Sequence, residues 1–97
     1  MHPVPPSDWQ PPDPWERLAD GQDLEHELDR EMCKTHPLRS LAPRAVARRT
    51  DCDDVLFALN DGRLAVVHLT WNHEVDPAWP YVEYVADWAD VTSELQT

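Results

Sequence analysis

The stretch 51–71, DCDDVLFALNDGRLAVVHLTW, constrains the fold most, because it joins the densest apolar run of the chain to its clearest turn signal. Two apolar segments flank Asn60-Asp61-Gly62, which is typical of a β-hairpin. A two-residue Asp-Gly loop would pair Leu59 with Leu64. A three-residue loop, with Gly62 in the left-handed region, would pair Leu59 with Arg63 instead.

Side-chain packing favours the three-residue loop, since a slip of one residue moves every side chain to the other face. In this register seven apolar side chains share one face, and full burial contributes roughly 1.5–3 kcal/mol for each large one. They are Val55, Phe57, Leu59, Ala65, Val67, Leu69 and Trp71. The opposite face carries Leu56, Ala58, Leu64 and Val66 and ends at Asp54, His68 and Thr70.

Two helices are expected before the hairpin. Asp13 suits an N-cap, Pro14 the first helical position and Glu16 a capping box, and Gly21 would end this first helix. A second helix is predicted over about residues 23–34, with an apolar stripe formed by Leu24, Leu28 and Met32.

A strand is predicted over residues 44–49, with Arg44, Val46 and Arg48 on one face and Ala45, Ala47 and Arg49 on the other. Its arginines favour a position at the edge of the sheet. Residues 81–84 predict a fourth strand and residues 86–95 a closing helix, with a helix through 81–95 as the alternative.

These elements predict an α+β fold, in which N-terminal helices pack on a three- or four-stranded antiparallel β-meander that is followed by a short C-terminal helix. Residues 13–97 are expected to form one domain. Residues 1–12 contain five prolines and predict a flexible tail. The chain lacks a signal-peptide pattern and an apolar span of membrane length, so a cytoplasmic protein is expected.

The net charge of −11 disfavours nucleic acid and anionic membranes as partners. The charge is also segregated: residues 1–37 carry −6, residues 38–50 carry +4 and residues 51–97 carry −9. The basic stretch either neutralises acidic neighbours or forms a small anion-binding patch. The two cysteines, Cys33 and Cys52, are too few for a disulfide framework.

Asp54 and His68 are the best candidates for chemistry, because the chosen register places them opposite each other. An aspartate that orients a histidine is the core of a general base. Thr70 and Cys52 lie nearby but lack an activating context, so a structural hydrogen bond is the preferred interpretation. Neither a metal nor another cofactor is predicted, since His68 and His73 do not have the spacing of zinc ligands.

Aromatic residues crowd the last third of the chain, where they indicate either core packing or a partner surface: Trp71, Trp79, Tyr81, Tyr84 and Trp88. The run ARRTDCDDVLFALNDGRLAVVHLTW, preceded by His36-Pro37-Leu38 and followed by Trp79-Pro80, resembles a family of small bacterial proteins. The likeness covers about residues 24–88, and it implies no established activity. The long proline-rich tail and the short C-terminus depart from that pattern.

The predicted function is therefore a non-enzymatic module that binds another protein through an acidic and aromatic surface, such as an immunity, antitoxin or inhibitor-like partner. The alternative is a small-ligand or enzymatic site around Asp54, His68 and loop 72–80, with Arg44 or Arg48 holding an anion. The candidate binding residues are Asp54, His68, Thr70, Trp71, His73, Trp79, Arg44 and Arg48.

Overall fold

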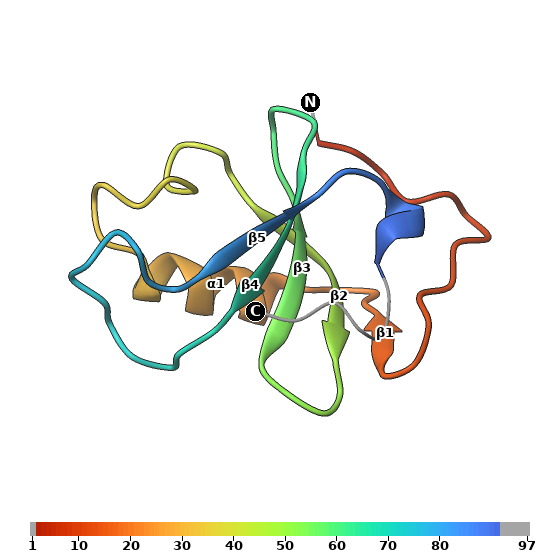
Figure 1. Ribbon diagram of the computed structural model, residues 1–97, viewed down its shortest axis with the longest axis horizontal. Helices are drawn as coiled ribbons and strands as arrows, with labels where there is room; N and C mark the ends of the chain where they lie inside the picture. The colour runs from red at the N-terminus through yellow and green to blue at the C-terminus, as the bar shows by residue number, and fades with distance from the viewer. Residues whose placement is uncertain (1, 92–97) are drawn as a thin grey trace.

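A computed structural model describes residues 2–91 and has one antiparallel sheet of five strands, ordered along the sheet as they are along the chain. One α-helix crosses one face of this sheet (Figure 1). The elements are β1 Trp15–Arg17, α1 Gln22–Glu31, β2 Arg44–Arg49, β3 Asp54–Ala58, β4 Leu64–His68, β5 Val82–Val85 and the 3-10 helix η1 Trp88–Asp90. The α+β class is confirmed, and the sheet has more strands than the sequence predicts.

The register of the central hairpin is the one that side-chain packing favours. Leu59 N–H donates to the Arg63 carbonyl at 2.9 Å, and Asp54 lies opposite His68. Gly62 has a φ of 93°, a conformation that glycine adopts without the steric cost of a Cβ. The three-residue loop is therefore confirmed.

The sheet has an apolar core on each face. The helix-side core includes Leu28 and Phe57, and the core on the opposite face includes Trp15 and Leu56. Six of the seven side chains predicted for the dry face belong to the helix-side core. The prediction is wrong for Trp71, which is 51% exposed and has a φ of 59°. The alternation of the strand does not extend to Trp71, because β4 ends at His68.

The predicted second helix is confirmed as α1, but it ends at Glu31 and not near residue 34, so Met32 of the predicted stripe follows directly after the helix. Leu28 and Met32 are buried in the helix-side core, and Leu24 lies beside them. The start of the helix approaches β2 closely. A Cβ built on Gly21 would lie 2.5 Å from Ala45 Cβ and 2.6 Å from the Ala45 carbonyl oxygen. Glycine is therefore required here by the contact between α1 and β2.

The variant Gly21→Ala is expected to lower the free energy of unfolding by roughly 1–3 kcal/mol, because overpacking forces a backbone shift. Urea denaturation followed by circular dichroism measures this effect. Gln22→Ala, at the exposed neighbouring position, is the control and should change stability by less than about 0.5 kcal/mol. Equal stability of the two variants would contradict the close approach.

The predicted first helix is wrong, because residues 15–17 form strand β1 at the edge of the sheet. Trp15 pairs with Arg49 and is buried in the core on the face opposite α1. Burial of this large side chain and the pairing with β2 outweigh the local capping pattern, which contributes only about 1 kcal/mol. Gly21 begins helix α1 instead of ending an earlier helix.

Strand β2 has the predicted bounds, but it is not an edge strand, since it lies between β1 and β3. The predicted alternation also fails. A register shift between Ala45 and Ala47 places Ala45 in the helix-side core and Ala47 in the opposite core. A bulge of this kind adds one residue to a strand and reverses the faces beyond it.

The predicted fourth strand is confirmed as β5, and the alternative helix through 81–95 is wrong for these residues. Val82 packs against the helix-side core and Val85 lies in the opposite core, so a strand uses both residues. The predicted C-terminal helix is also wrong in the described part, where one 3-10 turn, η1, stands in its place. Residues 92–95 of that prediction lie outside the described residues.

Residues 2–12 run along the molecule beyond β1 (Figure 1). Trp9 contacts Trp88, with 5.0 Å between ring centroids, and Arg17 donates to the carbonyls of Pro6 and Trp9. These contacts place the segment against the domain. Its flexibility stays a prediction.

Candidate functional site

Asp54 and His68 face each other at the ends of β3 and β4, with 2.8 Å between Asp54 Oδ1 and His68 Nδ1. The Asp54 carboxylate is buried, whereas the His68 ring is 44% exposed. This contact joins the first residue of β3 to the last residue of β4, as a structural hydrogen bond would.

The surroundings of Cys52 and Thr70 agree with the expectation that neither residue has an activating context. Burial raises the pKa of the Cys52 thiol, and the Asp54 charge raises it further, so the reactive thiolate is disfavoured. The Thr70 hydroxyl lies 3.2 Å from a Glu31 oxygen and 2.9 Å from a Glu74 oxygen. Two carboxyl groups therefore lie within hydrogen-bonding distance of this hydroxyl.

The most constrained polar group is Glu31, at the C-terminal end of α1, which sequence analysis did not single out. Its side chain is fully buried. Glu31 Oε1 accepts the Thr70 N–H and Oε2 accepts the Trp71 N–H, both at 2.8 Å. The Glu31 carbonyl also accepts the Glu74 N–H at 2.9 Å. We call this set of bonds the Glu31 latch, because it ties the loop after β4 to the helix.

Burial raises the pKa of Glu31 to about 7, and a hydrogen bond with Glu27 adds to this effect. The hydrogen bonds from the Thr70 and Trp71 backbones act in the opposite direction. At Glu27, burial acts to raise the pKa, but hydrogen bonds with Arg30 and Glu31 bring it below its ordinary value. The surroundings thus favour the protonated form at Glu31 and the ionised form at Glu27.

The latch positions two of the predicted site residues. Thr70 and Trp71 meet Glu31, and the left-handed backbone of Trp71 is held there by the bond from its own N–H. His73 lies near the same helix end, since its Nδ1 is 2.9 Å from the Arg30 carbonyl. These three residues are thus brought together by α1, and the exposed Trp71 ring is presented to solvent.

Arg48 and Arg44 are separated, because they lie at opposite ends of β2. Arg48 lines a small hollow of about 60 Å³ together with Cys52, Asp54 and Trp71. A hollow of this size holds no more than a few water molecules. The predicted convergence of Arg44 with Asp54 and His68 is not found.

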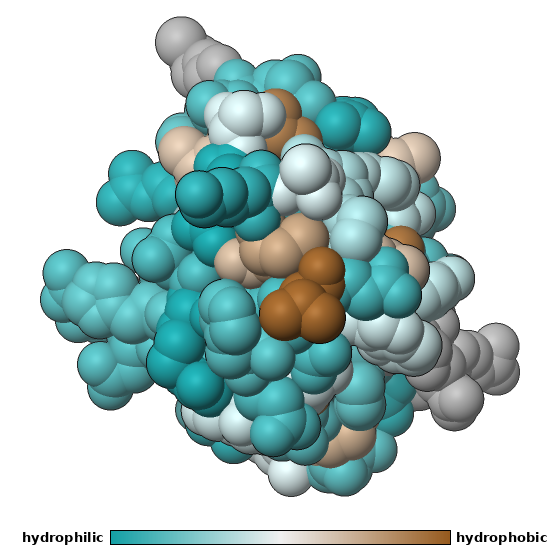
Figure 2. Space-filling model, turned by 90° about the vertical axis from the view of Figure 1, so that its left-hand side faces the viewer, coloured by the Kyte–Doolittle hydropathy of each residue, from teal (hydrophilic) through white to brown (hydrophobic). Residues whose placement is uncertain are grey.

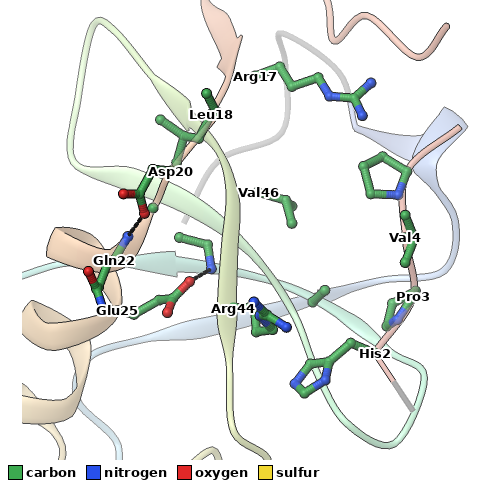
Figure 3. Close-up of a pocket in the computed structure, with 15 residues that line it drawn as sticks. His2, Pro3, Val4, Arg17, Leu18, Asp20, Gln22, Glu25, Arg44 and Val46 are labelled. Carbon is green, nitrogen blue, oxygen red and sulfur yellow. Dashed lines mark hydrogen bonds between the residues drawn. The ribbon is translucent and has the colours of Figure 1, made fainter. Parts of the chain in front are cut away.

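Arg44 instead lines a larger cavity of about 440 Å³ between β2, the start of α1 and the N-terminal segment (Figure 3). Two carboxylates in its wall are already engaged with the backbone. Asp20 accepts the Gln22 N–H and Glu25 accepts the Ala45 N–H, each at 3.0 Å. The wall thus mixes both signs of charge, which gives an anion no clear preference for this cavity.

A third region, residues 71–84, carries most of the large hydrophobic side chains that are exposed in the described residues, and we call it the acidic–aromatic segment. Five of the six large hydrophobic side chains that are exposed in residues 2–91 lie in it: Trp71, Val75, Trp79, Tyr81 and Tyr84. Glu74, Asp76 and Glu83 give the segment negative charge, and it has no lysine or arginine. Figure 2 shows the face on which the loop between β4 and β5 lies, and this face is mainly hydrophilic around a small hydrophobic area.

No protein-family model, curated protein or solved structure matches this chain. Among residues 2–91, no helix has the length and apolar character needed to cross a bilayer. The same described residues include no group of three or more His, Cys, Asp or Glu side chains arranged to hold a metal ion.

Proposed function

We propose that this chain is a non-enzymatic interaction module that binds a basic protein through the acidic–aromatic segment. The observation that carries the proposal is the concentration of exposed large hydrophobic side chains in residues 71–84, beside three acids and no lysine or arginine. Tryptophan and tyrosine supply much of the binding energy at protein interfaces. The acids would attract a positively charged partner and speed its association.

The anchoring of this segment supports the same function. The Glu31 latch holds its first residue, and His36 Nε2 donates to the Pro80 carbonyl at 3.0 Å near its other end. The His36 tautomer follows from its second bond, because Nδ1 accepts the Leu38 N–H. A surface that is fixed before binding loses less conformational entropy when a partner arrives. An inhibitor-like or immunity-like role in the bacterial cytoplasm fits this chemistry.

Affinity capture from the native cell with the wild type and with a Trp79→Ala, Tyr81→Ala variant tests the proposal. We expect the variant to retain the specific partner at least about tenfold less well, as for residues at the centre of an interface. Val4→Ala, which truncates an exposed apolar side chain outside the segment, is the matched control and should retain it fully. Capture of the same proteins by all three forms, or of none by the wild type, would refute the proposal.

A further inference from the structure

We propose that the outer edge of β5 receives an extended basic segment of the partner as a sixth, antiparallel strand. This inference rests on the proposed function, since it assigns a binding mode to part of the acidic–aromatic segment. It is carried by the unpaired backbone of β5, by the carboxylate of Glu83 and by the charge around them.

The backbone of β5 presents hydrogen-bonding groups outward. His68 N–H donates to the Tyr81 carbonyl, and Val66 lies opposite Glu83 in the same register. Bonded and non-bonded pairs alternate along an antiparallel ladder. The N–H and C=O groups of Val82 and Tyr84 therefore point away from β4, toward an edge on which no strand of the described residues lies.

The opposite edge of the sheet is less suitable. Strand β1 has only three residues, and Pro12 and Pro14 precede it without a backbone N–H to donate. Short edges and prolines are common ways in which proteins prevent strand addition. The outer edge of β5 is one residue longer and has no proline within residues 82–85, so it is the preferred edge for pairing.

Glu83 specifies the charge of the incoming strand. Its Oε2 atom is buried and has no hydrogen-bond partner in the described part of the chain. A buried acceptor without a partner is costly, and a carboxylate is satisfied best by a cationic donor. The residue that an added strand places opposite Glu83 would lie on the same face, in a non-hydrogen-bonded pair with Cα atoms about 4.5 Å apart. A lysine or arginine at that position would bring a cationic donor to the face of the sheet that carries the Glu83 carboxylate.

The residues beside Glu83 accept a different kind of contact. Tyr84 lies opposite Ala65, on the helix side of the sheet, and its ring is 45% exposed. Arg63 of this chain already stacks on that ring, with 4.3 Å from its Cζ to the ring centroid. An incoming strand with basic residues toward Glu83 and apolar residues toward Val82 and Tyr84 would complement both faces.

A second copy of this chain fits the edge poorly. Pairing of β5 with itself would bring two Glu83 carboxylates toward each other, and each chain carries a net charge of −11. Like charges that face each other across strands are destabilising. Charge complementarity therefore selects a basic segment of another protein over self-association.

The probe for this edge is a seven-residue peptide that alternates arginine and valine and is blocked at both ends, titrated into the ¹⁵N-labelled full chain. We expect saturable binding that protects the Val82 and Tyr84 amides from hydrogen exchange. The same peptide with glutamate in place of arginine should bind at least about tenfold more weakly, because the acids would then repel it. Protection elsewhere, or no binding of the arginine peptide, would overturn the β5 proposal.

Two variants test the separate contributions of charge and backbone. Glu83→Gln should weaken binding of the arginine peptide roughly tenfold, since charge-assisted hydrogen bonds are about twice as strong as neutral ones. Glu16→Gln, on the opposite edge strand, is the control and should bind like the wild type. Val82→Pro removes an outward N–H at an edge position where proline is tolerated, and it should abolish the protection of Tyr84. If Val82→Pro does not fold, the Glu83→Gln comparison and the amide protection decide the result.

The outcomes also separate this proposal from the proposed function. Loss of a captured partner in the Trp79→Ala, Tyr81→Ala variant, without peptide binding at β5, would overturn strand addition and leave the interaction function in place. Protection of the Val82 and Tyr84 amides that rises with protein concentration in the absence of peptide would overturn the basic partner in favour of a second copy. Equal peptide affinity of Glu83→Gln and Glu16→Gln would overturn the role of the Glu83 charge.

Discussion

Replacement of Glu31 by alanine is expected to lower the free energy of unfolding by roughly 3 kcal/mol at pH 5. The variant leaves the N–H groups of Thr70 and Trp71 without their acceptor, and each unsatisfied buried donor costs about 1–3 kcal/mol. Water that enters the vacated space would satisfy part of this loss, which keeps the expected value near the lower end of the sum. Urea denaturation at pH 5, followed by tryptophan fluorescence, measures the change.

Asp29→Ala is the matched control for this prediction, because Asp29 is an exposed carboxylate two residues earlier on the same helix and pairs with Arg39. Ion pairs of exposed side chains contribute only about 0.2–1 kcal/mol. The control should therefore cost less than about 1 kcal/mol. A loss in Glu31→Ala no larger than that in Asp29→Ala would refute the structural role of the latch.

The latch also links fold stability to the proposed binding surface. Trp71 is a non-glycine residue in the left-handed region, a conformation that costs of order 1–3 kcal/mol and persists only when its surroundings hold it. The bond from its N–H to Glu31 is such a constraint. Loss of Glu31 should therefore release the first residue of the acidic–aromatic segment, and partner binding should weaken along with stability.

The central hairpin could be predicted from sequence because the information that specifies it is local. Asn60-Asp61-Gly62 limits the choice to two loops, and the need for an uninterrupted apolar face selects one of them. The pairing of Asp54 with His68 follows directly from that choice, so this contact was predicted correctly. Its function was not settled by the pairing, since a strand contact and a catalytic pair share this geometry.

The N-terminal strand could not be predicted in the same way. Asp13, Pro14 and Glu16 fit a helix start, and the competing interaction is the pairing of Trp15 with Arg49. That partner is distant in sequence, so no periodicity within residues 13–20 reveals it. The bulge in β2 was missed for a related reason, because the extra residue at Ala45–Ala47 is specified by packing on both faces of the assembled sheet.

The sequence does contain an indication that Glu31 is buried, although it was not recognised in the sequence analysis. Residue 31 lies seven positions after Leu24 and three after Leu28, which places it on the apolar stripe of the helix. A carboxylate at such a position requires buried donors. Those donors are backbone N–H groups of Thr70 and Trp71, which have no mark in the sequence. The position of a buried acid could thus be inferred, but its partners could not.

The Glu31 carboxyl is expected to make the stability of the wild type depend on pH. The free energy of unfolding should fall by about 3 kcal/mol as the pH rises from about 4.5 to about 7. The reason is that the pKa of Glu31 is about 7 in the folded state and near 4.5 in the unfolded chain. Below pH 4.5 the Glu31 carboxyl is protonated in both the folded and the unfolded state, and its contribution to stability is complete. Between the two values, unfolding releases a proton, so higher pH favours the unfolded state. Above pH 7 both states are ionised, and Glu31 adds no further dependence.

The measurement is the difference in unfolding free energy between the wild type and Glu31→Ala at pH 5, 6, 7 and 8. This difference should shrink with rising pH, since only the wild type contains the group whose pKa is raised. His36 contributes with the opposite sign, because burial lowers its pKa, so its stabilisation is lost as the pH falls. Both proteins contain His36, and its effect cancels in the comparison. A difference that stays constant from pH 5 to pH 8 would show that the Glu31 carboxyl is not held as a buried acid, and the latch would then have to be an ordinary ionised contact.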